Sequence, residues 1–182
     1  MMVSLTNVGK YFGKFQNTLK MPPLVLMASV MLYVLLFDNK TFWRIALEVF
    51  GGDILALSGI IGALYFLNLA VFCIFSIPQL VKPFCVIVLM LSSVTSYYMD
   101  NLGVFIDREM IQNVMVTTVT ESKHLITIGF LLHVATYGLL PSILVIMVKL
   151  KKYSAVVTFG VPVFASIICF GVCIALLAID FK

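Results

Sequence analysis

The sequence predicts an all-α integral membrane protein with five transmembrane helices. Hydrophobic residues make up 62% of the 182 residues, charged residues make up only 11%, and the mean hydropathy is +1.14. A soluble globular domain carries about 25% charged residues, so the composition excludes that class. Five apolar runs contain no Asp, Glu, Lys or Arg, and they span 21–37, 54–77, 83–99, 125–148 and 155–177. Each run is near the length of about 20 residues that crosses the hydrocarbon core of a membrane.

The energetics of insertion favour helices for all five runs. A charge at the helix centre costs about 2.5 to 3.5 kcal/mol, whereas each large apolar residue contributes about 0.3 to 0.6 kcal/mol in favour of insertion. A transmembrane β-barrel would show short segments of alternating polarity, and these runs are continuous. The run 21–37 is longer than the core of a secretory signal, and no small-residue cleavage site follows it. We therefore interpret it as an uncleaved membrane anchor.

The segment after the first run, DNKTFWRIALEVFGGD, is predicted to form an amphipathic helix in the membrane interface. Its aromatic and aliphatic residues recur with helical spacing, Arg44 and Glu48 lie on the opposite face, and Gly51 and Gly52 end the pattern. Trp43 favours the depth of the lipid headgroups, so we expect this helix to lie flat and act as an anchor.

The distribution of charged residues predicts the orientation of the chain. One set of loops contains lysines without acidic residues, namely Lys10, Lys14, Lys20, Lys82, Lys149, Lys151 and Lys152. The other set contains seven acidic residues with four basic ones: Asp38, Glu48, Asp53, Asp100, Asp107, Glu109 and Glu121, with Lys40, Arg44, Arg108 and Lys123. The positive-inside rule places the first set, and the N-terminus, in the cytoplasm. Five crossings then place the C-terminus on the outer side.

The most polar stretch, DREMIQNVMVTTVTESKHL at 107–125, lies between the third and fourth runs. Its first half has apolar residues on one arc of a helical wheel, and Asp107 is suited to cap that helix. The run VTTVT has poor helix propensity, and Thr118 with Glu121 matches a capping box that would start a new helix. We therefore predict an interfacial helix with a break near Thr117 or Thr118.

Three polar residues in this stretch form the candidate binding site. Asn113, Thr117 and Glu121 are spaced by four, so an unbroken helix would present them on one face. The carboxylate would bind an ammonium group, while the amide and the hydroxyl would contact the phosphate or glycerol of a lipid headgroup. The alternative is that Glu121 caps a helix and Asn113 is merely solvated.

Other residues that suggest function have simpler structural interpretations. Cys169 and Cys173 share a helix face but lack the further ligands that zinc needs, so we predict that they pack as small hydrophobes. We expect His133 to bond a backbone carbonyl of a neighbouring helix. Pro141 should kink the fourth span and free a backbone carbonyl for another partner. Gly59, Gly62 and Ala63 should allow close helix packing. No signature of nucleic-acid binding is present.

The segment SSVTSYYMDNLGVFIDREMIQNVMVTTVTESKHLIT, at 92–127, resembles the membrane domain of the bacterial phosphoethanolamine transferases that modify lipid A, a group that includes the mobile colistin-resistance enzymes. The family pattern falls without gaps on Tyr98, Gly103, Ile106, Asp107, Arg108, Met110, Ile111, Asn113, Thr117 and Glu121. The segment GLLPSILVIMVKL, at 138–150, resembles the family's fourth span. Leu102 departs from the pattern, since the family usually has Tyr there.

The resemblance implies a multi-pass protein of the bacterial inner membrane, with interfacial helices and the C-terminus on the periplasmic side. In the family, a periplasmic catalytic domain holds zinc and a threonine nucleophile. That domain takes phosphoethanolamine from phosphatidylethanolamine and passes it to a lipid A phosphate, a modification linked to polymyxin resistance. The positions of Asn113, Thr117 and Glu121 are implied to help bind the substrate lipid beneath that domain.

The catalytic domain is absent from this chain, so residues 1–182 are expected to form a transmembrane domain that is inactive alone. No cofactor is expected in it. The expected partners are the bilayer, phosphatidylethanolamine, lipid A and, if the native chain is longer, the periplasmic catalytic domain. The alternative is a stand-alone, non-enzymatic lipid-binding or accessory protein. A transporter is disfavoured because transporters usually bind substrates near the membrane midplane between repeats, and no repeat is found here.

Overall fold

The computed structural model describes residues 20–50, 52–103, 112, 126–151 and 153–180. Its elements in chain order are β1 (Lys20–Met21), α2 (Pro23–Phe37), α3 (Lys40–Phe50), α4 (Ile54–Ile74), α5 (Val81–Leu102), α8 (Ile128–His133), η2 (Val134–Leu139), α9 (Leu140–Met147), β2 (Lys149–Leu150) and α10 (Ala155–Asp180). Apart from two short strands, the described elements are helical. The predicted all-α integral membrane fold is therefore confirmed.

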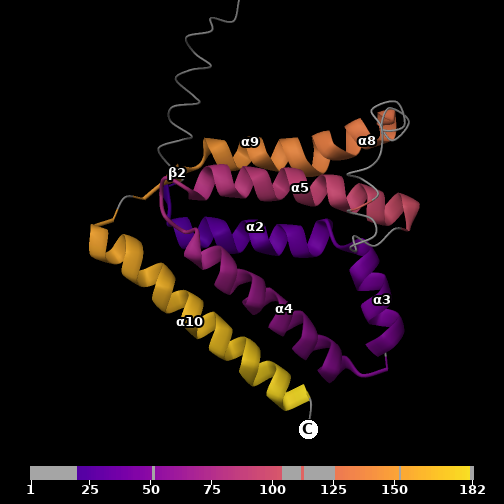
Figure 1. The fold of residues 1–182 in the computed structure, drawn as a ribbon, viewed down its shortest axis with the longest axis horizontal. Helices are drawn as coiled ribbons and strands as arrows, with labels where there is room; N and C mark the ends of the chain where they lie inside the picture. The colour runs from indigo at the N-terminus through magenta and orange to yellow at the C-terminus, as the bar shows by residue number, and fades with distance from the viewer. Residues whose placement is uncertain (1–19, 51, 104–111, 113–125, 152, 181–182) are drawn as a thin grey trace, which may run out of the picture.

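The long helices pack in the spatial order α10, α4, α2, α5 and α9 (Figure 1). The core forms around α2, whose buried residues contact α4, α5 and α9. Those buried core residues are Leu26, Met27, Val30, Met31 and Leu35 of α2, with Phe72, Val81, Cys85, Leu89 and Val145 of the other helices. At the lower end of the view in Figure 1, α4 and α10 diverge from the layer formed by α2, α5 and α9.

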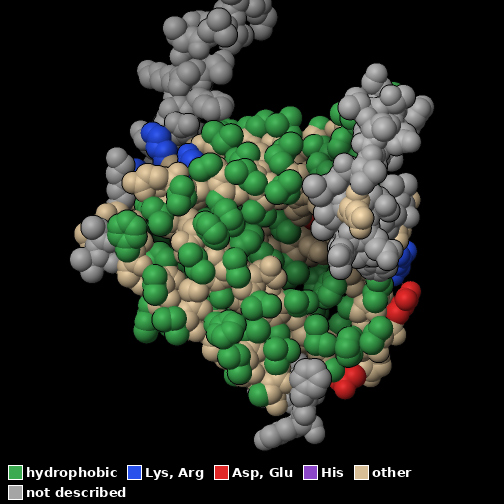
Figure 2. Space-filling view, viewed as in Figure 1, with side chains coloured by type: hydrophobic (Ala, Val, Ile, Leu, Met, Phe, Trp, Pro, Cys, Tyr) green, Lys and Arg blue, Asp and Glu red, His purple; other side chains and the backbone are tan. Residues whose placement is uncertain are grey.

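Four helical stretches among the described residues are long and apolar enough to cross a membrane: Ile54–Ile74, Val81–Asn101, Ile128–Met147 and Val157–Ala178. These match four of the predicted spans. The visible face of the bundle is covered by hydrophobic side chains, with charged side chains near its two ends (Figure 2). This distribution is the one expected for a surface that contacts lipid.

The first predicted span differs from the prediction. Pro22 is the N-cap and Pro23 is the first residue of the helix, so α2 has 15 residues rather than the 17 of the run 21–37. At 1.5 Å per residue, α2 rises about 22 Å, which is less than the hydrocarbon thickness of about 30 Å. The count reaches five when α2 and α3 are taken together as one span bent by 68°.

Two side chains stabilise the bend between α2 and α3. Asn39 donates from Nδ2 to the carbonyl of Val34 at 2.8 Å, and Trp43 donates from Nε1 to the carbonyl of Leu35 at 2.7 Å. Both carbonyls belong to the last turn of α2, where few intrahelical donors remain; that of Val34 also accepts the backbone N–H of Asp38 at 3.1 Å. Trp43 therefore caps the C-terminal end of α2. This is a defined structural role, in addition to the interfacial anchoring that its residue type predicts.

Small residues allow α4 and α10 to pack closely, as predicted from Gly59, Gly62 and Ala63. A Cβ atom on Gly62 would lie 3.0 Å from Cδ1 of Leu176, so the glycine accommodates that leucine. Ser166 donates to the carbonyl of Ala70 across the same interface at 2.8 Å. The four cysteines are free and buried in the helix packing.

Lys20, Lys82 and Lys149 lie together, and we name their surroundings the lysine end. The strands β1 and β2 pair in parallel, with Lys20 opposite Lys149, and Lys82 donates from Nζ to the carbonyl of Ile146 at 2.7 Å. The opposite end contains α3, the end of α5 and the start of α8, and we name it the α3 end. Among the residues that the structure describes, the lysine-only set is thus separated from the acidic set, and the assignment of the lysine end to the cytoplasm stays a prediction.

Candidate functional site

A polar cavity of about 420 Å³ lies at the α3 end of the bundle. Three elements that are far apart in the sequence contribute its lining, namely α3, the last turn of α5 and the end of α8. The lining residues are Lys40, Thr41, Arg44, Asp100, Asn101 and His133. Two cations and one carboxylate therefore line one cavity. We name it the charged cavity.

Asp100 connects α5 to α3 at this cavity. Thr41 donates from Oγ1 to Oδ1 of Asp100 at 2.7 Å, and Thr41 is itself buried. The Lys40 ammonium lies 5.1 Å from the centroid of the Tyr137 ring, a distance suited to a cation–π contact. Hydrogen bonds that involve a charged group are among the stronger ones in proteins. The contact with Thr41 therefore positions the Asp100 carboxylate, and the contact with Tyr137 positions the Lys40 ammonium.

His133 lies at the inner wall of the charged cavity. Its Nε2 is 3.0 Å from the hydroxyl of Ser96, and its ring stacks on that of Tyr137 with centroids 4.6 Å apart. The predicted partner, a backbone carbonyl of a neighbouring helix, was wrong, because the buried hydroxyl of Ser96 on α5 faces this turn of the helix. His133 thus has a structural partner and also lines the cavity.

The helix that presents His133 is irregular directly after it. Residues Val134–Leu139 form a π-helical segment, and Pro141 follows two residues later. Proline has no N–H, so in a regular α-helix the carbonyl of Tyr137, four residues before it, would lack its donor. The hydroxyl of Tyr33 donates to that carbonyl at 3.1 Å. The predicted effect of Pro141, a freed carbonyl with another partner, is confirmed, and Tyr33 is that partner.

A second cavity, of about 410 Å³, lies beside the α2–α3 bend and contains a buried acid. Asp38 is 6% exposed, and neither of its carboxylate oxygens has a hydrogen-bond partner among the described residues. Burial raises the pKa of Asp38 to about 6, and the Asp100 carboxylate adds to the increase. The nearby Ser92 hydroxyl and the Lys40 ammonium act in the opposite direction, without making a hydrogen bond of good geometry. The carboxyl is therefore neutral more readily than an exposed Asp.

The predicted site residues lie outside the described residues. Asn113, Thr117 and Glu121, the interfacial helix and its predicted break all fall within the segment between α5 and α8. Thr127, directly before α8, contacts α5: its Oγ1 is 2.8 Å from the hydroxyl of Tyr97. The predicted substrate contacts therefore stay predictions.

Sequence reasoning did not identify the lining of the charged cavity. Lys40 and Asp100 were noted only as loop charges that report orientation, and Arg44 also as part of the polar face of a helix. His133 was given a structural role, and Thr41 and Asn101 were not singled out. A partial signal was present, because Asp100 and Asn101 are polar residues directly after an apolar span. The contact between Thr41 and Asp100 joins residues 59 positions apart, which no local pattern reveals.

Comparison with known proteins gives consistent results. The family described as "Phosphoethanolamine transferase EptA/EptB" matches residues 64–182. Phosphatidylethanolamine transferase Mcr-2 from Escherichia coli is 33% identical over 135 residues, which cover 71% of this chain and 24% of Mcr-2. Phosphatidylethanolamine transferase Mcr-1 from Escherichia coli is 30% identical over 133 residues, which cover 70% of this chain and 24% of Mcr-1.

The fold also matches a solved structure. Integral membrane protein lipooligosaccharide phosphoethanolamine transferase A (EptA) from Neisseria meningitidis superposes with a TM-score of 0.79 and 26% identity. The match covers 89% of this chain and 31% of that protein. The chain therefore spans about a quarter of the length of the curated relatives it matches.

Proposed function

Because the chain belongs to the phosphoethanolamine transferase EptA/EptB family, we propose that it forms the membrane domain of an enzyme that moves phosphoethanolamine from phosphatidylethanolamine to lipid A. In this role residues 1–182 anchor a periplasmic catalytic domain in the bacterial inner membrane. They also supply part of the site for the lipid substrate.

The charged cavity is the observation that best supports this function. Phosphatidylethanolamine has a zwitterionic headgroup, with an anionic phosphate close to a primary ammonium. Lys40 and Arg44 supply positive charge for the phosphate, and Asp100 supplies a carboxylate for the ammonium. Among the described residues, Thr41 donates to Oδ1 of Asp100 and no donor is found for Oδ2, which can accept a hydrogen bond from the ligand.

Asn113, Thr117 and Glu121 complete the proposed substrate site. They belong to the segment that joins α5 to α8, and the last turn of α5 and the last residue of α8 line the charged cavity. A second carboxylate, Glu121, together with an amide and a hydroxyl would extend the same zwitterion-binding chemistry towards the catalytic domain.

We propose no zinc site in the described part of this chain. Among the residues that the structure describes, no three His, Cys, Asp or Glu side chains come together as metal ligands. In the proposed full-length enzyme, zinc belongs to the catalytic domain. The membrane domain would contribute binding and orientation of the lipid headgroup, and the chemical step would take place elsewhere.

Lipid selectivity of the purified chain tests the charged cavity. The chain would be reconstituted in nanodiscs with equal amounts of phosphatidylethanolamine and phosphatidylcholine, and retained lipid would be counted by native mass spectrometry. We expect preferential retention of phosphatidylethanolamine, because its ammonium can donate hydrogen bonds to Asp100 and a choline group cannot. Asp100→Asn should lower that preference by about tenfold, the value of one charge-assisted hydrogen bond.

The substitution is chosen to leave the fold intact. An Asn at position 100 can still accept the hydrogen bond from Thr41 while it loses the negative charge. Asp53→Asn is the matched control, because Asp53 caps the start of α4 and is not part of the cavity lining. Equal retention of both lipids by the wild-type chain, or an unchanged preference in Asp100→Asn, would overturn the assignment of this cavity.

A further inference from the structure

A basic cavity of about 790 Å³ lies at the lysine end, away from the charged cavity. Lys20, Lys82 and Lys149 line it, and each comes from a different segment of the chain. The pairing of β1 with β2 aligns Lys20 with Lys149, and the hydrogen bond to the Ile146 carbonyl fixes the Lys82 ammonium. None of its described lining residues is acidic, so the described lining carries a net positive charge.

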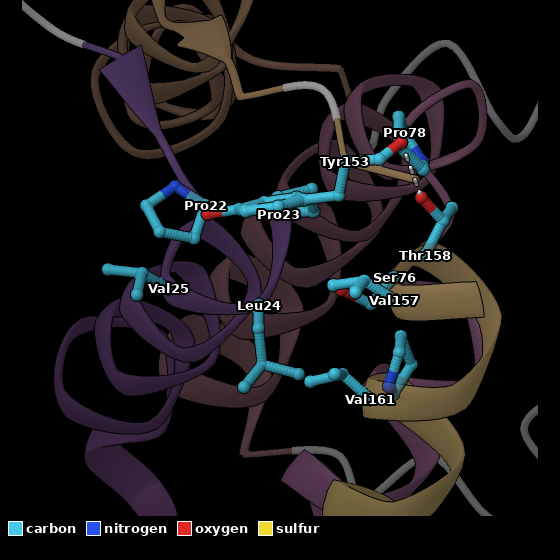
Figure 3. Close-up of a pocket in the computed structure, with 11 residues that line it drawn as sticks. Pro22, Pro23, Leu24, Val25, Ser76, Pro78, Tyr153, Val157, Thr158 and Val161 are labelled. Atoms are coloured by element: carbon cyan, nitrogen blue, oxygen red, sulfur yellow. Dashed lines mark hydrogen bonds between the residues drawn. The ribbon is translucent and has the colours of Figure 1, made fainter. Parts of the chain in front are cut away.

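An apolar groove of about 260 Å³ continues from this cavity into the bundle (Figure 3). One wall is the start of α2, with Leu24 and Val25, and the other is the first part of α10, with Val157 and Val161. Pro78, Tyr153 and Thr158 line both the groove and the basic cavity. The two spaces are therefore adjacent, with the charged part at the end of the bundle and the apolar part along the helices.

A buried polar group in the groove lacks a partner. Ser76 is 2% exposed, and its hydroxyl has no hydrogen-bond partner among the described residues. Ser76 lines the groove near the point where it meets the basic cavity, close to Pro78 in the sequence (Figure 3). A buried hydroxyl without a partner is costly, so a ligand oxygen at this place would be favoured.

We propose that the basic cavity and the apolar groove together bind one anionic phospholipid. Its phosphate would lie among the three lysines, an ester oxygen would accept a hydrogen bond from Ser76, and the first part of one acyl chain would occupy the groove. A net negative headgroup matches the charge of the cavity better than a zwitterionic one. This site is separate from the proposed substrate site, so the failure of either leaves the other standing.

The test compares lipids of different headgroup charge. The chain would be reconstituted in nanodiscs that contain equal amounts of phosphatidylglycerol and phosphatidylcholine, and lipid retained after detergent extraction would be counted by native mass spectrometry. We expect one tightly retained phosphatidylglycerol per chain. Lys20→Gln should lower its retention about fivefold, since each lysine near a membrane surface contributes about that factor. Salt at 0.5 M should weaken retention further by screening.

Lys151→Gln is the matched control. Lys151 is an exposed lysine two residues after Lys149, and it is not part of the lining of either space. It should leave the retention of phosphatidylglycerol unchanged. If Lys151→Gln lowers retention as much as Lys20→Gln, the attraction is a diffuse surface effect and the proposed site is wrong. Equal retention of the two lipids by the wild-type chain would also contradict it.

A variant in the groove separates lipid binding from phosphate binding. Val161→Phe adds bulk to the α10 wall without a change in charge and should lower the retention of phosphatidylglycerol. The affinity for inorganic phosphate, measured by calorimetry, should stay the same in this variant. If Val161→Phe retains phosphatidylglycerol as well as the wild-type chain does, no acyl chain occupies the groove and the proposal fails.

Discussion

The hydroxyl of Tyr33 on α2 donates a hydrogen bond of 3.1 Å to the backbone carbonyl of Tyr137 on η2. That carbonyl lies four residues before Pro141, so no proline N–H is present to bond it. The Tyr33 hydroxyl thus supplies the hydrogen bond that Pro141 cannot donate to this carbonyl. Tyr137 in turn stacks on His133 and lies beneath the Lys40 ammonium. The contact therefore connects the irregular part of the fourth span to the charged cavity.

Removal of the Tyr33 hydroxyl should destabilise the bundle. Tyr33→Phe leaves the Tyr137 carbonyl without its donor, and we expect a loss of about 1 kcal/mol in the free energy of unfolding. In a Pro141→Ala background the residue at 141 can donate to that carbonyl, so Tyr33→Phe should cost less. Unfolding in mixed detergent micelles, measured for the four proteins of this cycle, gives the coupling energy. Additive effects would mean that the hydroxyl does not act through the proline defect.

Gly138 should be intolerant of any side chain. A Cβ atom there would collide with the Ser93 hydroxyl and lie 3.1 Å from Ser93 Cβ and 3.2 Å from Met90 Sδ. Because Ser93 is fully buried, Gly138→Ala should lower the free energy of unfolding by about 1 to 3 kcal/mol.

Gly160→Ala is the control for Gly138→Ala, and its expected effect on stability has the opposite sign. No described residue lies within 4 Å of a Cβ atom at Gly160, which is exposed on α10. That change should stabilise the helix by up to about 1 kcal/mol, since alanine is the better helix former. The same unfolding assay compares the two variants. Equal effects of the two substitutions would show that helix propensity, rather than the contact with α5, governs Gly138.

Asp38 should make the stability of the chain depend on pH. Its pKa is about 6 in the folded protein against an ordinary value of 3.8, so the folded state binds the proton more tightly than the unfolded state does. The stabilisation by that proton is fully present below about pH 4 and is lost as the pH rises through about 6. Asp38→Asn carries no such charge. Its melting temperature should therefore increasingly exceed that of the wild-type chain between pH 4 and pH 7.

Thermal unfolding in detergent at several pH values checks this expectation. The quantity of interest is the difference in melting temperature between Asp38→Asn and the wild-type chain. A difference that stays constant from pH 4 to pH 7 would mean that the carboxyl is well solvated or has a partner in the folded protein.

The sequence predicted those features that follow from local patterns. Charge-free apolar runs identified four helices that are long enough to cross a membrane, since the cost of burying a charge is a property of the run itself. The freed carbonyl near Pro141 and the close packing at Gly62 follow equally from residue type. The start of α2 at Pro23 was not predicted, because the apolar run begins at Met21 and includes both prolines, whereas the helix begins only at the second.

Features that depend on long-range contacts were not predictable. Asp38 looked like an ordinary loop acid, and only the 68° bend after α2 shows that it is buried. The same bend places Thr41 against Asp100 and so creates the charged cavity. The partner of His133 was predicted wrongly for the same reason, since residue type cannot show which group of a neighbouring helix lies within reach.

Phosphoethanolamine on lipid A is the most direct measure of the central claim. A full-length transferase that carries this chain as its membrane domain would be expressed in a bacterial strain lacking its own transferases. The lipid A would then be analysed by mass spectrometry. We expect Asn113→Ala and Glu121→Ala to reduce the modified fraction at least tenfold at equal protein level, with Gln112→Ala near the wild-type value. Unreduced modification in both variants would contradict a role for these residues in substrate binding. A lack of any modification by the unmutated protein would contradict the proposed function itself.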